Sequence, residues 1–135
     1  MTRGGLHHVE LRTGDLGAAG DAWGWLLGTL GYEPFQRWPS GRSWRLGPVY
    51  VVLESAPLDG VHDRRRPGLS HLAFHAGTSD DVEHIWSAAP EHGWRCLYED
   101  RHPYAGGPDH HAAFLEDAER FKVELVADQP DGEAR

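Results

Sequence analysis

The stretch Leu6-His7-His8-Val9-Glu10-Leu11 has a counterpart in the middle of the chain, Leu69-Ser70-His71-Leu72-Ala73-Phe74. Each stretch is followed by a turn containing Gly and Asp, then by a helical pattern, and then by a Gly next to an aromatic residue. Each copy closes with an apolar strand that carries one carboxylate, Glu54 in the first copy and Glu124 in the second. A repeat of this length indicates a duplicated structural unit.

Both copies have the pattern of one strand, one helix and three further strands. The helices are expected from Asp15, a capping residue, to about Leu30, and from about Ser79 to His92. The expected strands are 6–13, 32–38, 43–46 and 49–55, then 69–75, 94–98, 110–115 and 121–127. The sequence therefore predicts an α+β fold of two tandem βαβββ modules that form a cupped mixed sheet.

We expect one domain over residues 1–135. Module one covers about 6–55, a polar linker covers 56–67, and module two covers about 68–127. The remaining residues, 128–135, are polar and are expected to form a frayed tail.

Composition narrows the class of protein. The chain has 135 residues and a net charge of −8, and its only dense basic run is Arg64-Arg65-Arg66, which argues against a nucleic-acid partner. No apolar run approaches the roughly 18 residues of a membrane span, and the start of the chain has no signal-peptide pattern. Cys96 is the sole cysteine, so an internal disulfide is impossible. We therefore expect a cytoplasmic protein without a membrane partner.

The repeated His and Glu residues suggest chemistry. Side chains alternate across a strand, so each of these strands has an apolar face and a face that carries a His or a Glu. A sheet with one wet face would explain polar alternation alone, but it predicts a mixture of Thr, Ser, Lys and Glu. Two imidazoles and two carboxylates instead suit a divalent metal ion such as Zn, Ni, Co, Mn or Fe. The residues concerned are His8, Glu54, His71 and Glu124.

At these residues the chain resembles the vicinal oxygen chelate superfamily, which includes glyoxalase I, fosfomycin and bleomycin resistance proteins, and extradiol dioxygenases. The resemblance covers about residues 6–127. Each matching segment is weak alone, but the set in this order is specific. The segments are 6–12, 27–32, 68–74, 114–117 and 123–125.

The resemblance implies a cup that holds metal and substrate, and it implies a homodimer. Carried over by position, the metal ligands are His8, Glu54, His71 and Glu124; His7 is the neighbouring candidate, but its parity places it with the apolar residues. Four ligands resemble glyoxalase I more than the extradiol dioxygenases, whose set is two His and one Glu.

The predicted function is that of a metal-dependent enzyme resembling glyoxalase-like isomerases and lyases. The ion would bind vicinal oxygens of a small molecule and stabilise an enolate, with Glu54 or Glu124 as the catalytic base. One alternative is a non-catalytic binding protein that sequesters a toxic compound. A second is an extradiol-type dioxygenase with His8, His71 and Glu124 on iron.

Further residues are candidates for substrate binding. Two tryptophans on early strands would form aromatic walls, and a long loop from Glu99 to Asp109 is long enough to cover the site. Of the two histidines that open the strand at 110–115, one must face the cup by parity. The candidates are Trp38, Trp44, His75, Tyr104, His110 and His111.

Overall fold

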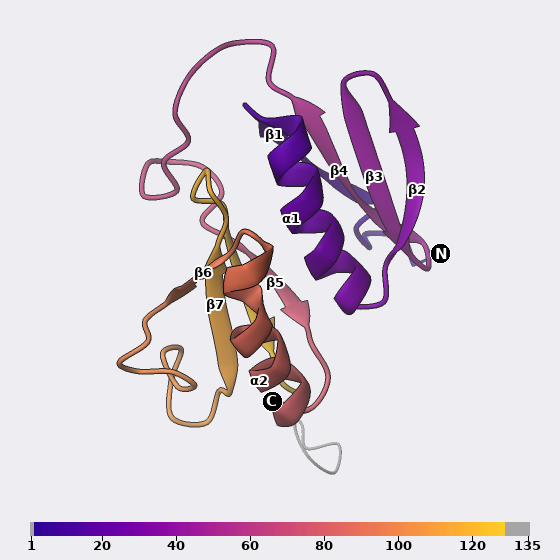
Figure 1. Ribbon diagram of the computed structural model, residues 1–135. Helices are drawn as coiled ribbons and strands as arrows, with labels where there is room; N and C mark the ends of the chain where they lie inside the picture. Colours follow the sequence, from indigo (N-terminus) through magenta and orange to yellow (C-terminus); the bar gives the residue numbers. More distant parts are fainter. Residues whose placement is uncertain (1, 129–135) are drawn as a thin grey trace. The chain divides into compact units, whose positions relative to one another are not determined.

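The computed structural model describes residues 2–128, and the chain forms two compact units, Met1–Val61 and His62–Arg135. The boundary falls inside the predicted linker. Each unit contains one βαβββ module, as Figure 1 shows. All of the predicted tail except Asp128 lies outside the described residues.

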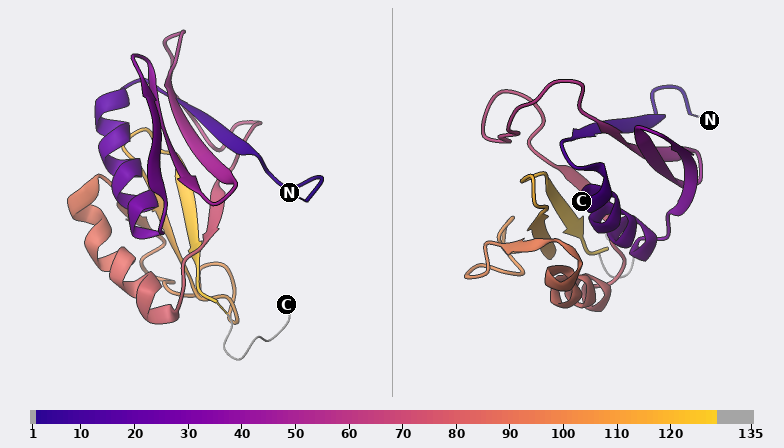
Figure 2. Two further views of the ribbon diagram at one scale, coloured as in Figure 1. Left: turned by 90° about the vertical axis from the view of Figure 1, so that its right-hand side faces the viewer. Right: turned by 45° about the horizontal axis from the view of Figure 1, so that its top comes forward.

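Module one is a four-stranded mixed sheet with one helix along one face (Figure 2). The strand order is β1-β4-β3-β2, in which β1 runs parallel to β4 and the other pairs are antiparallel. The elements are β1 (His8–Thr13), α1 (Leu16–Thr29), β2 (Glu33–Trp38), β3 (Gly41–Leu46) and β4 (Val49–Ser55).

The helix α1 begins and ends where the sequence predicts. The Asp15 side chain caps it by accepting a 3.1 Å hydrogen bond from the Ala18 amide. The chain leaves the helix through Gly31 at φ 97°, a conformation that costs glycine little. The inner side of α1 is apolar, and its fully buried side chains are Trp23, Leu26 and Leu27.

Module two repeats the arrangement. Its strand order is β5-β8-β7-β6, with β5 parallel to β8. The elements are β5 (Leu72–His75), α2 (Ser79–Ala88), a 3-10 turn η1 (Ala89–His92), β6 (Arg95–Leu97), β7 (Ala112–Glu116) and β8 (Lys122–Val126). The predicted α+β fold of two βαβββ modules is thus confirmed. The helix expected to reach His92 changes to a 3-10 turn, where Pro90 lacks an amide donor.

The two faces of the module-two sheet differ. Cys96 on β6 hydrogen-bonds the Trp86 carbonyl of α2, and Leu115 lies directly opposite Cys96, so both belong to the face that packs on α2. By alternation, Phe114 and Glu124 lie on the other face, which we call the far face of module two.

Within residues 2–128, no helix has the length and apolar character that crossing a membrane requires.

Candidate functional site

Three of the candidate residues meet on the far face of module two. Glu124 on β8 lies opposite Ala73, and His71 immediately precedes β5. The His71 Nε2 atom lies 3.0 Å from Glu124 Oε1, and His110 Nε2 contacts the other oxygen, Oε2. The side chain of Glu124 is 12% exposed, whereas those of His71 and His110 are 29% and 28% exposed. We call these residues the His71–Glu124–His110 cluster.

Neighbouring residues hold the two rings of the cluster. Ser70 Oγ lies 2.9 Å from His71 Nδ1, the ring nitrogen that does not face Glu124, and this contact limits rotation of the ring. The Phe114 ring packs edge-on against His71 with centroids 6.3 Å apart. A Cβ at Gly106 would lie 2.8 Å from the His110 ring, so glycine is needed there for the ring to keep its place.

Further along the far face lies a basic and phenolic pair. Lys122, two residues before Glu124 on β8, donates a 3.1 Å hydrogen bond to the Tyr98 hydroxyl. The Tyr98 ring contacts Phe114, and Phe114 lies directly opposite Glu124. Hydrogen bonding from Lys122 is the main cause that holds the pKa of Tyr98 below its usual value. The sequence interpretation missed this pair, although the parity of Lys122 with Glu124 was a signal for it.

The far face also carries a buried carboxylate. Glu116 is 1% exposed and accepts a 2.5 Å bond from Arg64 Nη1, while Arg95 Nη2 contacts its other oxygen. A buried charge requires such partners, because an unpaired one would be costly. One member of the basic run in the predicted linker is thus part of the packing of module two.

In module one, His8 takes part in an aromatic group. Its ring stacks on Tyr50, the residue directly opposite it on β4, with centroids 4.8 Å apart and planes 4° apart. His8 Nδ1 also lies 2.9 Å from His7 Nδ1.

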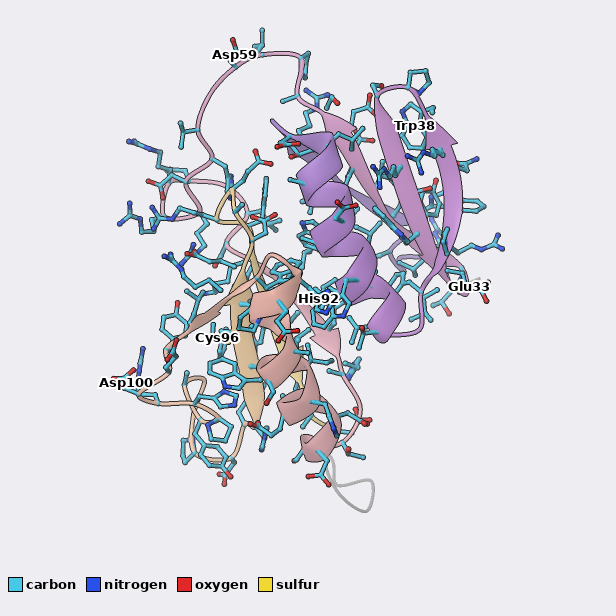
Figure 3. All side chains as sticks on the ribbon, in the orientation of Figure 1. Glu33, Trp38, Asp59, His92, Cys96 and Asp100 are labelled. Carbon is cyan, nitrogen blue, oxygen red and sulfur yellow. The ribbon has the colours of Figure 1, made fainter. Side chains whose placement is uncertain are left out.

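Glu54 lies elsewhere on the same sheet. It is opposite Arg12, four residues beyond the position opposite His8, which is about 13 Å along a strand. Glu54 Oε2 accepts a 2.8 Å hydrogen bond from Trp38 Nε1, and Oε1 accepts a 2.5 Å bond from Ser40. Figure 3 labels Trp38 at the end of β2. The structure therefore does not bring Glu54 and His8 together.

The parallel strand pairs can be compared directly. In module two, the residue two positions after His71 is Ala73, which faces Glu124. In module one, the residue two positions after His8 is Glu10, which faces Val52. Val52 consequently occupies the position in module one that matches Glu124.

The remaining substrate-binding candidates are spread over other surfaces. Trp44 is 6% exposed and lies against Gly24 of α1, on the face opposite Glu54. The His75 side chain is 94% exposed, and its nearest acidic partner is Asp128 at 3.6 Å.

His111 points away from the cluster that holds its neighbour His110. Its Nε2 lies 2.7 Å from Glu83 of α2, and His102 binds the same carboxylate at 2.9 Å. The Tyr104 ring contacts His111 with centroids 5.8 Å apart, and the His102 ring stacks on Trp86 of α2. These residues anchor the long loop to the helix.

The chemistry of the cluster bears on a metal ion. Tetrahedral ligands about 2.1 Å from an ion are about 3.4 Å apart, whereas His71 Nε2 and Glu124 Oε1 are 3.0 Å apart and hydrogen-bond each other directly. In residues 2–128, no group of three or more His, Cys, Asp or Glu is arranged around one ion. The His71–Glu124 pair is thus the part of the predicted ligand set that the structure brings together.

The chain belongs to the Glyoxalase/Bleomycin resistance protein/Dioxygenase superfamily, whose family model matches residues 7–114. This confirms the resemblance to the vicinal oxygen chelate proteins. YqjT of Bacillus subtilis strain 168, an uncharacterized protein, is 46% identical over 125 residues, which are 90% of this chain and 98% of YqjT.

Solved structures share the fold. A crystal structure of a candidate glyoxalase from Bacillus halodurans has a TM-score of 0.89 and 45% identity, and the match covers 93% of this chain and 97% of that one. A mutant of the fosfomycin resistance protein FosX of Listeria monocytogenes, complexed with Mn(II) and 1S,2S-dihydroxypropylphosphonic acid, has a TM-score of 0.67 and 18% identity. That match covers 96% of each chain.

Proposed function

We propose that this protein is a metal-dependent enzyme of the glyoxalase-like isomerase or lyase kind, acting on a small molecule with two neighbouring oxygens. The observation that carries the proposal is the His71–Glu124–His110 cluster, in which two imidazoles meet one carboxylate on a single sheet face. Membership of a superfamily that contains enzymes supports it. The Mn(II) in the FosX complex supports a divalent ion.

In this proposal His71 and Glu124 are the first two ligands, and His110, whose Nε2 contacts the other oxygen of Glu124, would have to turn toward the ion to become a third donor. A bound divalent ion would polarise a substrate oxygen and stabilise negative charge on it. Ser70 orients the His71 ring by bonding its Nδ1, so that Nε2 faces Glu124. Of the two predicted bases, Glu124 is the one that lies in the cluster.

Metal content of purified variants tests the proposal. We expect about one divalent ion per chain in the wild type, and loss of that ion in His71→Ala and Glu124→Gln. His75→Ala is the matched control, because His75 lies four residues from His71 and its side chain is 94% exposed. A His8→Ala variant and a Glu54→Gln variant test the two predicted ligands of module one separately.

Two results would contradict the proposal. One is a His71→Ala protein that keeps its full metal content. The other is wild-type protein that stays metal-free after purification with added Zn or Mn. Metal-free protein that binds an aromatic compound tightly would instead favour sequestration.

The register of module one favours a second candidate, the extradiol-type dioxygenase. Because Val52 takes the place that matches Glu124, the predicted ligand set of two His and two Glu loses one carboxylate. Two His and one Glu form the ligand set that such dioxygenases use on iron. Oxygen uptake by iron-loaded protein with catechol distinguishes this candidate, since an isomerase or lyase consumes no oxygen.

We propose further that the protein is a cytoplasmic homodimer. A reducing compartment suits Cys96, which is a free thiol. Light scattering coupled to size-exclusion chromatography tests the dimer, with a mass of twice the 15.1 kDa of one chain as the expected result.

A further inference from the structure

Tyr98 has an unusual backbone conformation for a large side chain. It follows β6 at φ 58°, in the left-handed region that crowds the Cβ atom of most residues. Its carbonyl accepts hydrogen bonds from the amides of Arg101 and His102, at 2.9 and 3.0 Å, which fix the turn. The backbone thereby holds the phenol ring over the far face of module two, and strained residues of this kind often serve a site.

Positive charge surrounds the phenol. Lys122 Nζ donates to the hydroxyl at 3.1 Å and lies 5.3 Å from the ring centroid. The Arg101 guanidinium lies 5.0 Å from the same centroid, and the Arg64 guanidinium is a further, smaller cause that lowers the pKa of the phenol. Glu116 on β7 is bonded to Arg64 and Arg95, so its charge is directed to those two residues.

The phenol and the His71–Glu124–His110 cluster share one surface. Lys122 and Glu124 are two residues apart on β8, so their side chains point to the same face about 7 Å apart. Phe114 lies between the two groups, because its ring contacts both Tyr98 and His71. A small molecule held at Glu124 would thus extend over Phe114 toward Tyr98.

The carboxylates predicted as bases already have partners. The oxygens of Glu54 accept bonds from Trp38 and Ser40. Those of Glu124 contact His71 and His110, and as a metal ligand Glu124 would be still less basic. A separate proton acceptor on the same face would leave Glu124 free to bind the ion.

We propose that Tyr98 is the catalytic acid–base residue of this site and that Lys122 is the positioning residue that stabilises its phenolate form. The inference rests on the proposed function, since it needs a substrate held at the cluster. The pKa of Tyr98 is shifted downward by Lys122, which agrees in direction with this role, because a base must lose its own proton before it can take another.

The substrate class is a small compound with a C–H bond next to a carbonyl group. The phenolate oxygen of Tyr98 forms an O–H bond to the hydrogen of that carbon. The C–H bond breaks, and its electron pair moves to make a carbon–carbon double bond and an oxyanion on the former carbonyl. Return of the proton from the Tyr98 hydroxyl to carbon completes the exchange, so no oxidant or reductant is consumed.

Exchange of hydrogen for deuterium tests this step. Hydroxyacetone is incubated in D2O with zinc-loaded protein, and loss of its CH2 signal is followed by proton NMR. We expect exchange with the wild type and a reduction of about 100-fold or more in Tyr98→Phe, as for the loss of a general acid–base group. Tyr32→Phe is the matched control, because Tyr32 is a tyrosine of module one and is not part of the His71–Glu124–His110 cluster. Zinc content should be equal in all three proteins.

An ultraviolet titration provides a readout that does not depend on turnover. We expect one tyrosine of the wild type to ionise below the usual value of about 10, and this transition should be absent in Tyr98→Phe. Lys122→Met keeps an aliphatic side chain over the rings of Tyr98 and Phe114 but removes the charge. It should therefore shift the ionisation of Tyr98 to higher pH. Lys122→Arg should restore it in part.

The proposal is overturned if Tyr98→Phe exchanges as fast as the wild type, if the zinc-loaded wild type gives no exchange, or if Lys122→Met leaves the titration unchanged. These outcomes differ from failure of the proposed function. The proposed function fails if His71→Ala keeps the metal content of the wild type, and this result does not depend on how Tyr98 titrates.

Discussion

Trp38 donates a 2.8 Å hydrogen bond from its indole nitrogen to Glu54, and this bond joins the end of β2 to the end of β4. The two strands are not neighbours in the sheet, since β3 lies between them. The bond passes over Gly41 of β3, where any Cβ would overlap both the Trp38 ring and the Glu54 carboxylate. A glycine on the central strand is therefore required for this contact.

The first prediction is that Glu54 contributes to the stability of module one. Glu54→Ala leaves the Trp38 and Ser40 donors without their acceptor, so we expect a loss of about 1–3 kcal/mol in the free energy of unfolding. Urea denaturation measures it, with Glu10→Ala, an exposed position on the same face, as the control. If Glu54→Ala leaves the urea midpoint unchanged but loses the bound metal, Glu54 is a metal ligand rather than a stabilising residue.

The second prediction concerns the buried carboxylate of β7. Removing one member of a buried ion pair leaves the other charges uncompensated, so Glu116→Ala should cost about 3–5 kcal/mol. Chemical denaturation followed by circular dichroism measures the change. The control, Asp63→Asn, breaks an exposed pair with Arg65 and should leave the midpoint unchanged. Equal midpoints for the two variants would show that the ion pairs of Glu116 with Arg64 and Arg95 do not contribute to stability.

The third prediction is a pH dependence at Glu83. Burial raises the pKa of Glu83, but hydrogen bonds from His102 and His111 outweigh this effect, so the pKa lies below its usual value. Because folding lowers this pKa, the unfolded chain takes up the proton more readily. The charged Glu83 carboxylate therefore stabilises the folded chain above the usual pKa of about 4.3. This stabilisation is lost as the pH falls through the lower pKa that Glu83 has in the folded chain.

Glu83→Gln measures this effect. Its thermal-unfolding midpoint should lie below that of the wild type at about pH 5, and the gap should shrink toward about pH 3. Glu91→Gln, an exposed acid in η1, is the control and should show no such trend. A gap that widens on acidification would mean that the carboxylate is not held in its charged form.

The fourth prediction is that the only thiol reacts slowly. Burial, with a smaller contribution from the charge of Glu99, raises the pKa of Cys96 to about 11; Figure 3 labels this residue in module two. A free cysteine has a pKa of about 8.5, so at about pH 8 the native thiol should react with Ellman's reagent about 100-fold more slowly than the unfolded chain. A native rate equal to that in denaturant would contradict the raised pKa of Cys96.

The sequence predicted much of the fold because the repeat itself carries the information. Hydrophobic alternation located the strands, and Asp15 and Gly31 marked the ends of α1. The strand expected at 69–75 begins only at Leu72, so His71 lies just before the hydrogen-bonded region. This placement leaves the ring free to turn toward Glu124.

Glu54 shows where sequence reasoning reaches its limit. Alternation tells which face a side chain occupies, but a shift of two residues keeps the face and moves the side chain about 7 Å along the strand. Glu54 and Val52 therefore have the same parity, and only the pairing of β1 with β4 shows that Val52 matches Glu124. Trp44 illustrates a related limit, because its face depends on cross-strand pairing with Val51.

The adjacent histidines just before β7 have a mechanical consequence. His110 contacts Glu124 on one side of the sheet, while His111 is tied to Glu83 of α2 on the other. Two neighbouring residues of the backbone are thus bound to carboxylates on opposite surfaces of the sheet. If the backbone shifts toward a molecule bound at the cluster, the contact between His111 and Glu83 of α2 must stretch. Occupancy of the cluster should consequently register as altered amide protection at the first turns of α2, well away from any ligand atom.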